Sequence, residues 1–193
     1  MPYPIWHRSL IRSVTTQSPI FIKTIIMNIR FLIPAVLAFA VTACQKVPAA
    51  DADDQAFVAQ ELAVFASELE ASLPADTSAL KDRITSYLSS HPSVFYGTTV
   101  TLLDTNGLAV YSPYVYRPNG MDLVYTNSLM DSAYQINSQL WLRAPIDQAA
   151  SVWTEPYFDE GGGDIWMKTR SVPIYQNGSI RAVATTDVRV KKP

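Results

Sequence analysis

A switch in hydrophobic periodicity near residue 93 narrows the folds open to this chain more than any other feature. Across residues 55–73 the apolar side chains recur every three to four positions, which predicts an amphipathic helix that ends at Pro74. A second helix is expected to begin at Asp76 or Thr77 and to end before His91. From residue 93 onward the chain is rich in β-branched and aromatic residues, which is typical of strands. Two helices followed by strands favour an α+β domain.

The expected strands are separated by turn-forming residues. Residues 93–103 and 108–116 flank the turn signal Asp104-Thr105-Asn106-Gly107, which predicts a hairpin. Residues 122–150 mix short helical and irregular stretches. This order predicts one antiparallel sheet with helices on one face. The three further strands that we expect, with glycine-containing turns between them, are residues 151–158, 165–175 and 179–190.

The N-terminal region has the pattern of an export signal. Met27 is followed by Arg30 and by an uncharged apolar run at residues 31–40, which is shorter than the roughly 20 residues that a membrane span needs. The run leads into Cys44, the single cysteine of the chain. We predict that residues 1–43 are a signal peptide and that translation starts at Met27. Two alternatives stay open: Cys44 ends an uncleaved anchor helix, and residues 1–26 extend the signal.

The segment Val41-Thr42-Ala43-Cys44 resembles the lipobox of bacterial lipoproteins. The resemblance implies that the signal is cut before Cys44 and that this cysteine carries a lipid such as palmitate. Residues 44–54 then form a lipidated tether, and residues 55–193 form a single domain. An aspartate directly after the lipidated cysteine would resemble an inner-membrane retention signal, and this position is Gln45 here, which implies outer-membrane attachment facing the periplasm. In a bacterium with one membrane, the chain would lie in the cell envelope on the outer face of the cell membrane.

Composition excludes one class of partner. Apolar residues make up 48% of the chain and charged residues 17%, which is typical of a globular protein. From Cys44 onward, eleven Lys and Arg residues stand against seventeen Asp and Glu residues. Because this surface repels phosphate groups, we expect no nucleic-acid partner.

The sequence also lacks the residues of common catalytic and metal sites. After the signal region it has one histidine, His91, and it has no G-x-S-x-G segment, so the usual nucleophile and base pairs cannot form. Zinc ligation fails for the same reason. We therefore expect no enzyme activity, no cofactor and no metal. An acid–base pair formed by Asp159 and Asp187 stays open as an alternative, because their separation cannot be read from the sequence.

Three segments in the C-terminal part of the chain resemble the Cache domain, a PAS-like extracytoplasmic sensor. They are Trp153-Thr154-Glu155-Pro156-Tyr157-Phe158-Asp159, Thr169-Arg170-Ser171-Val172-Pro173-Ile174-Tyr175 and Ala182-Val183-Ala184-Thr185-Thr186-Asp187-Val188. The resemblance implies an antiparallel sheet with a long N-terminal helix and further helices packed on it. It also implies a domain that binds a small-molecule ligand.

The same resemblance implies a set of ligand-binding residues: Tyr134, Gln139, Trp141, Tyr157, Asp159 and Asp187. Gln139 occupies the position at which Cache domains with amino-acid ligands carry an arginine. Since a glutamine cannot grip a carboxylate as a guanidinium does, amino acids become doubtful as a class. Aromatic rings with two carboxylates instead favour a cationic amine. The alternative is packing: Trp141, Tyr157, Trp153 and Tyr175 would be core or sheet residues, and Asp187 would cap a turn.

A second function from another class is also consistent with the sequence. In this alternative, the chain is a lipid-anchored accessory protein whose Cache-like fold has lost its ligand and contacts a partner protein. The sequence ends at Val190-Lys191-Lys192-Pro193, directly after the last expected strand. We therefore expect any signal to pass through another protein, such as a signalling membrane protein.

Overall fold

The computed structural model describes residues 48–120, 122–161 and 163–193. The predicted signal peptide at residues 1–43, the start at Met27 and the lipid site at Cys44 lie outside these residues. Within the described part of the chain, none of the helices combines the length and the apolar character needed to cross a membrane.

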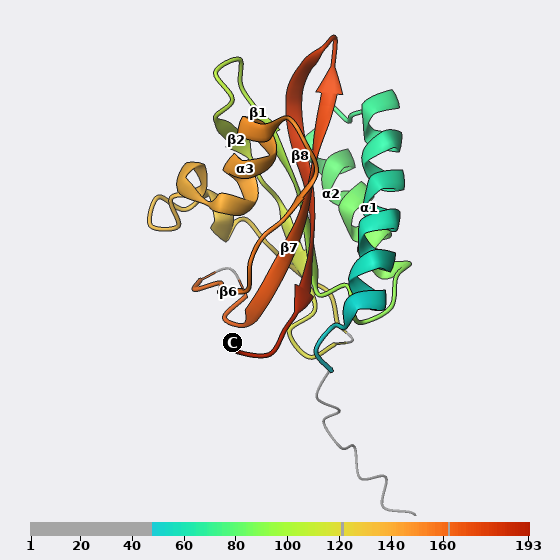
Figure 1. The fold of residues 1–193 in the computed structure, drawn as a ribbon. Helices are drawn as coiled ribbons and strands as arrows, with labels where there is room; N and C mark the ends of the chain where they lie inside the picture. The colour runs from blue at the N-terminus through green and yellow to red at the C-terminus, as the bar shows by residue number, and fades with distance from the viewer. Residues whose placement is uncertain (1–47, 121, 162) are drawn as a thin grey trace, which may run out of the picture. The chain divides into compact units, whose positions relative to one another are not determined.

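An eight-stranded antiparallel sheet organises the fold (Figure 1). Strands of 11 residues each, β7 and β8, form its central hairpin, and β8 pairs on its other side with β1. The order across the sheet is β4-β3-β1-β8-β7-β5, with β2 also paired to β1 and β6 to β7. The strands are β1 (Gly97–Leu103), β2 (Ala109–Tyr111), β3 (Tyr114–Tyr116), β4 (Val124–Thr126), β5 (Val152–Trp153), β6 (Tyr157–Phe158), β7 (Trp166–Gln176) and β8 (Ser179–Arg189).

Helices lie on both faces of this sheet (Figure 1). The long helix α1 (Ala52–Ala71) and the helix α2 (Thr77–Ser89) cover one face, and α3 (Leu140–Gln148) lies on the other. Two 3-10 turns, η1 (Ser128–Met130) and η2 (Ile136–Ser138), precede α3. The α+β class, the long N-terminal helix and the antiparallel sheet are confirmed. The expectation that helices lie on one face only is wrong, because residues 122–150 contribute α3 to the opposite face.

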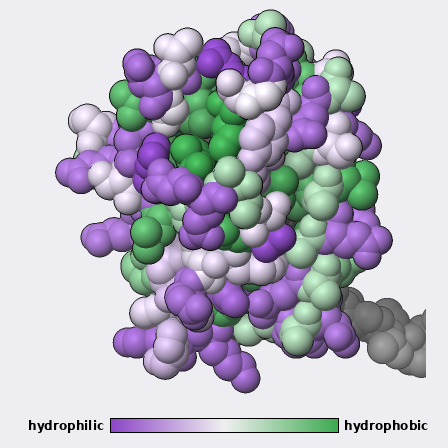
Figure 2. Space-filling view, turned by 45° about the horizontal axis from the view of Figure 1, so that its top comes forward, coloured by the Kyte–Doolittle hydropathy of each residue, from purple (hydrophilic) through white to green (hydrophobic). Residues whose placement is uncertain are grey.

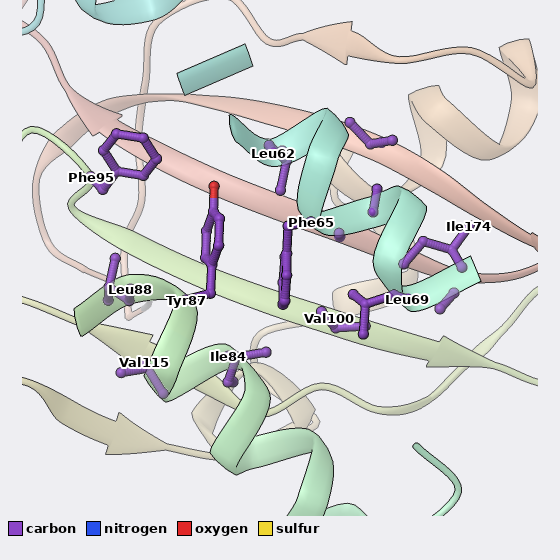
Figure 3. Packing of buried hydrophobic residues seen from close by; sticks show 14 of the residues in the cluster. Leu62, Phe65, Leu69, Ile84, Tyr87, Leu88, Phe95, Val100, Val115 and Ile174 are labelled. Carbon is purple, nitrogen blue, oxygen red and sulfur yellow. The ribbon is translucent and has the colours of Figure 1, made fainter. Parts of the chain in front are cut away.

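The core between α1, α2 and the sheet is built from large apolar side chains (Figure 3). The rings of Phe65 on α1 and Tyr87 on α2 stack with their centroids 4.3 Å apart. The hydroxyl of Tyr87 reaches the sheet and lies 3.1 Å from Thr186 Oγ1, in a buried hydrogen bond. Burial raises the pKa of Tyr87, so this hydroxyl keeps its proton. The helices and β8 are thus joined by both packing and a polar contact.

Alternation along β8 separates this core from a second one. Ala182 and Ala184 belong to the core under α1 and α2, whereas Val183 belongs to a cluster with Trp141 and Leu142 of α3. Since successive side chains of a strand point to opposite faces, the residues that follow Val183 at every second position also face α3. The face seen in Figure 2 is largely hydrophilic, and hydrophobic residues are exposed on it most clearly near the upper centre of the view.

Helix α1 begins three residues earlier than the periodicity predicts. The Asp51 side chain accepts a hydrogen bond from the Asp54 backbone N–H at 2.9 Å, and the Asp54 carboxylate accepts one from the Asp51 N–H at 3.1 Å. This reciprocal cap satisfies two N–H groups at the helix start and places negative charge where the helix dipole favours it. Residues 52–54, expected in the tether, therefore form the first turn of α1.

Prolines divide two of the expected strands. The strand predicted at residues 151–158 is split into β5 and β6 around Pro156, and the one at residues 108–116 is split into β2 and β3 around Pro113. A proline has no N–H to donate to a neighbouring strand, so pairing stops there. Strand β4 lies within the stretch that was expected to be helical and irregular.

Candidate functional site

Five of the six predicted ligand residues line one small cavity between α3 and the sheet. Asp187 comes from β8, Tyr157 from β6, and Asp159 directly follows β6; Tyr134 precedes η2 and Trp141 lies in α3. On β8, Thr185 and Asp187 reach the cavity because side chains at every second position after Val183 face α3. The remaining residues that line the cavity are Thr99, Tyr114, Leu129 and Thr185.

Asp187 is the centre of a directed hydrogen-bond network. Its carboxylate accepts from the Tyr114 hydroxyl at 2.8 Å and from Thr169 Oγ1 at 2.6 Å. Because Thr169 uses its one proton on Asp187, the Tyr157 hydroxyl at 2.8 Å must donate to Thr169 Oγ1. Asp187 is only 5% exposed, and this burial raises its pKa to about 7 even though its hydroxyl donors favour the charged form.

Asp159 forms a second network on the other side of the cavity. The Tyr134 hydroxyl donates to Asp159 Oδ1 at 2.9 Å, and it accepts from the Trp141 indole N–H at 3.2 Å. Burial raises the pKa of Asp159 to about 6, against the effect of the Tyr134 hydrogen bond. Among the described residues that line the cavity, none carries a positive charge. Two buried carboxyl groups therefore share a small space without a cationic partner.

The cavity has a volume of only about 10 Å³, which is room for one water molecule. Tyr134, Tyr157 and Asp159 also line an outer groove of about 630 Å³. These three side chains thus form the wall between the inner cavity and the open groove. A ligand larger than water reaches Asp187 only when this wall moves, whereas the groove is already wide enough for a small organic molecule.

Gln139 differs from the other five residues in its position. It lies at the start of α3 and lines the outer groove rather than the cavity. Its side-chain Nε2 donates to the Tyr134 backbone carbonyl at 2.8 Å. The amide therefore holds the segment before η2 from which the Tyr134 hydroxyl reaches Asp159. A direct ligand contact by Gln139 stays a prediction.

Sequence reasoning missed Tyr114 and Thr169, the two donors to Asp187. Tyr114 crosses over β1 at Gly97, where a Cβ atom would overlap its hydroxyl group. Gly97 is paired with Asp187 in the sheet, so the missing side chain makes room for the Tyr114–Asp187 hydrogen bond. A glycine at the start of a β-rich segment was the available signal, because such a glycine often marks a close approach.

Of the residues weighed as packing residues, Trp153 and Tyr175 lie away from the cavity, whereas Trp141 and Tyr157 line it. Trp153 packs partly buried against the core under α1 and α2, with Lys168 Nζ 5.6 Å from its ring centroid. The Tyr175 hydroxyl donates to the Ala149 carbonyl at 3.1 Å. In the glycine-rich turn after β6, Asp164 accepts from the Gly161 N–H at 3.0 Å, which is an ordinary turn contact.

Comparison with known proteins relates this arrangement to sensor domains. A family model described as methyl-accepting chemotaxis protein-like, first PDC sensor domain, matches residues 80–192. A search of curated proteins finds no match.

Solved structures share the fold at low sequence identity. The extracellular domain of soHK1S-Z6, assigned as a histidine kinase, is 23% identical with a TM-score of 0.56, over 70% of this chain and 53% of that chain. The ligand-binding domain of the Pseudomonas aeruginosa PAO1 amino acid chemoreceptor PctC, in complex with GABA, is 17% identical with a TM-score of 0.52, over 71% of this chain and 57% of that chain. The sensory domain of the Campylobacter jejuni chemoreceptor Tlp3, with isoleucine bound, is 16% identical with a TM-score of 0.52, over 71% and 52%. The chain thus spans about half the length of the domains it matches.

Proposed function

This chain belongs to the family of methyl-accepting chemotaxis protein-like first PDC sensor domains, and from this premise we propose that it binds a small molecule with a cationic amino group. The family consists of ligand-binding sensor domains, which do not catalyse reactions. The amine would enter through the outer groove and place its ammonium group between Asp159 and Asp187. Tyr134, Trp141 and Tyr157 would surround it, and Gln139 would contact the part of the ligand that stays in the groove.

One observation carries this proposal. Two buried carboxyl groups with raised pKa values face the same cavity, and none of the described residues that line it is a lysine or an arginine. Charging both groups in the empty domain is costly, because each lacks an opposite charge to offset its loss of water. A bound ammonium ion supplies that charge, and four aromatic rings at the cavity add cation–π attraction. The two named chemoreceptor ligands, GABA and isoleucine, each carry an amino group.

The same geometry argues against an amino-acid zwitterion as the preferred ligand. The described residues lining the cavity and the outer groove include no lysine or arginine that could bind a carboxylate. Gln139 holds the Tyr134 carbonyl instead. We therefore expect amines without a carboxylate to bind more tightly than the matching amino acids.

Isothermal titration with a panel of amines and amino acids tests the proposal. An Asp187→Asn variant should bind the best amine more than about 30-fold more weakly, since removing one member of a buried charge pair costs about 2–5 kcal/mol. Asp82→Asn, which changes an exposed carboxylate on α2, is the matched control and should leave the affinity unchanged. Lack of binding by both ligand classes would reject the proposal.

The cell-envelope location of this domain is a further part of the proposal. Residues 1–43 would be removed as a signal peptide, and Cys44 would be lipidated and anchor the domain of residues 55–193 through the tether, at the outer membrane facing the periplasm. The support is the sequence pattern before and at Cys44. Mass spectrometry of the protein extracted from envelopes would show the acylated Cys44 as its first residue. Cys44→Ser should release the domain from the membrane fraction.

The alternative of a partner-binding protein without a ligand has one observation in its favour, which is the very small volume of the cavity. A thermal-shift screen separates the two functions. A ligand present at 100 times its dissociation constant stabilises the domain by about 2.7 kcal/mol. A screen of amines and amino acids without any shift favours the partner protein.

A further inference from the structure

A mixed aromatic and basic surface surrounds the end of β8, at the opposite end of the hairpin from its turn. We call this surface, formed by Phe158, Ile165, Trp166, Lys191 and Lys192, the docking face. These residues line a groove of about 680 Å³. The rings of Phe158 and Trp166 lie 6.1 Å apart, and Lys192 Nζ lies 5.9 Å from the Trp166 ring centroid. Phe158 is 47% exposed, which is unusual for a phenylalanine.

The charge of the docking face is opposite to that of the domain. Residues 48–193 contain ten Lys and Arg residues and seventeen Asp and Glu residues. Three of the ten basic residues, Arg189, Lys191 and Lys192, fall within the last five positions and line the same groove, where Asp164 is the one acidic residue. An acidic domain therefore carries a local positive surface beside exposed aromatic rings.

The chain enters the domain at this same face. The Ala50 N–H donates to the Arg189 carbonyl at 2.9 Å, and Pro48 and Ala49 line the groove together with Lys191 and Lys192. Figure 1 shows the start of α1 and the C-terminus at the same end of the molecule. Pro48 lies four positions after Cys44, so a lipid on Cys44 can lie at most about 14 Å from the docking face. If the apolar run at residues 31–40 is the anchor instead, the limit is about 29 Å.

We propose that the docking face binds the anionic surface of the membrane that carries the chain. Basic side chains attract anionic lipid headgroups, and tryptophan and phenylalanine insert at the boundary between headgroups and acyl chains. The short connection keeps the face close to the lipids, so the domain lies against the membrane instead of moving freely on its tether. This inference rests on the membrane attachment proposed above, and it holds for a lipid on Cys44 and for an uncleaved anchor helix.

An environment-sensitive dye on an introduced cysteine tests the proposal in the full chain. Pro193→Cys places the dye beside Lys192, and Ser179→Cys places it at the other end of β8, roughly 30 Å away along the strand. The chain without an added cysteine gives the blank. Each protein is reconstituted in phosphatidylcholine vesicles with or without about one third phosphatidylglycerol, and quenching by lipids with a quencher at the headgroup is measured.

We expect the dye at residue 193 to be quenched in the anionic vesicles and the dye at residue 179 to stay unquenched. Lys191→Ala with Lys192→Ala should lower the docking equilibrium constant about 30-fold, or about fivefold for each lysine. Lys81→Ala with Arg181→Ala removes the same charge elsewhere and should leave docking unchanged.

Two results would overturn the docking proposal. One is equal quenching at residue 193 in vesicles with and without phosphatidylglycerol. The other is protection of the dye at residue 193 from the quencher that increases with protein concentration, because this result would mean that a second copy of the chain covers the docking face. Flotation of the vesicles separates this failure from failure of attachment. A chain that floats with the vesicles but shows no anionic dependence is attached without docking, whereas a chain that does not float lacks the anchor.

Discussion

Replacing Asp187 by asparagine should stabilise the empty domain at alkaline pH while it weakens amine binding. The pKa of Asp187 is raised from 3.8 to about 7 by burial. The folded domain therefore binds this proton more tightly than the unfolded chain does, and acid favours the folded state. The contribution is fully present below about pH 4 and is lost as the pH rises through about 7. A shift of this size corresponds to about 4 kcal/mol.

Asparagine removes this pH-dependent loss at a modest cost in hydrogen bonding. Its side-chain oxygen can still accept from the Tyr114 hydroxyl, and its amide can donate to Thr169 Oγ1, which then has to direct its own proton elsewhere. We expect a cost of about 1 kcal/mol from the altered network. Near pH 8 the variant should therefore be more stable than the original by about 3 kcal/mol, and near pH 4 it should be less stable by about 1 kcal/mol.

Urea unfolding at a series of pH values measures this change of sign. Asp159, whose pKa is raised to about 6, is unchanged in the variant, so part of the loss of stability between about pH 4 and pH 6 should persist. An Asp82→Asn protein, altered at an exposed position, should follow the original curve. If the Asp187→Asn and original proteins lose stability in parallel as the pH rises, the carboxyl group of Asp187 is not destabilised by burial and the reasoning fails.

Three further substitutions test the framework around the cavity. Gly97→Ala should destabilise the domain and weaken amine binding together, because the new Cβ displaces the Tyr114 hydroxyl from Asp187; denaturation and titration of the same sample measure both, and a change in stability alone would contradict this. Arg117→Ala should lower the free energy of unfolding by about 2–3 kcal/mol, because the buried guanidinium donates to the carbonyl of Leu88 in α2 and to that of His91 just after the helix. Urea unfolding measures this loss, and Arg181→Ala is the control that should change little. Asp51→Ala should lower the free energy of unfolding by about 1 kcal/mol, because it removes the cap of α1. Increased hydrogen exchange in the first turn of that helix would locate the effect.

The sequence predicts those elements whose signals are local. The periodicity of residues 55–73 identifies α1, and Asp76 caps α2 as expected, with its side chain accepting from the Ala79 N–H at 3.1 Å. The hairpin of β7 and β8 follows from the turn at Asn177 and Gly178. The interruptions of strands at Pro113 and Pro156 were readable in principle, because proline cannot donate to a neighbouring strand. The β-rich residues between the turn signals predict continuous strands at both places.

The candidate site also has a part that can be predicted from the sequence and a part that cannot. Tyr134, Trp141, Tyr157, Asp159 and Asp187 could be named because a family resemblance places them, and the structure brings them together. Tyr114 lies 73 positions before Asp187 in the chain, and only the pairing of β1 with both β3 and β8 makes them neighbours. The direction of the Gln139 side chain depends on the backbone at Tyr134, which no sequence pattern reports. Long-range pairing and side-chain direction are the parts that the sequence does not supply.

Two consecutive residues of β8 serve the two halves of the molecule. Asp187 points into the cavity, and Thr186, directly before it, points through the other face to the hydroxyl of Tyr87 on α2. A displacement of a single peptide unit is therefore felt on both sides of the sheet. We expect that a molecule which draws the Asp187 carboxylate toward itself also shifts Thr186 and its hydrogen bond to Tyr87, so that occupancy of the cavity would reach the helical layer without a hinge or a moving subdomain.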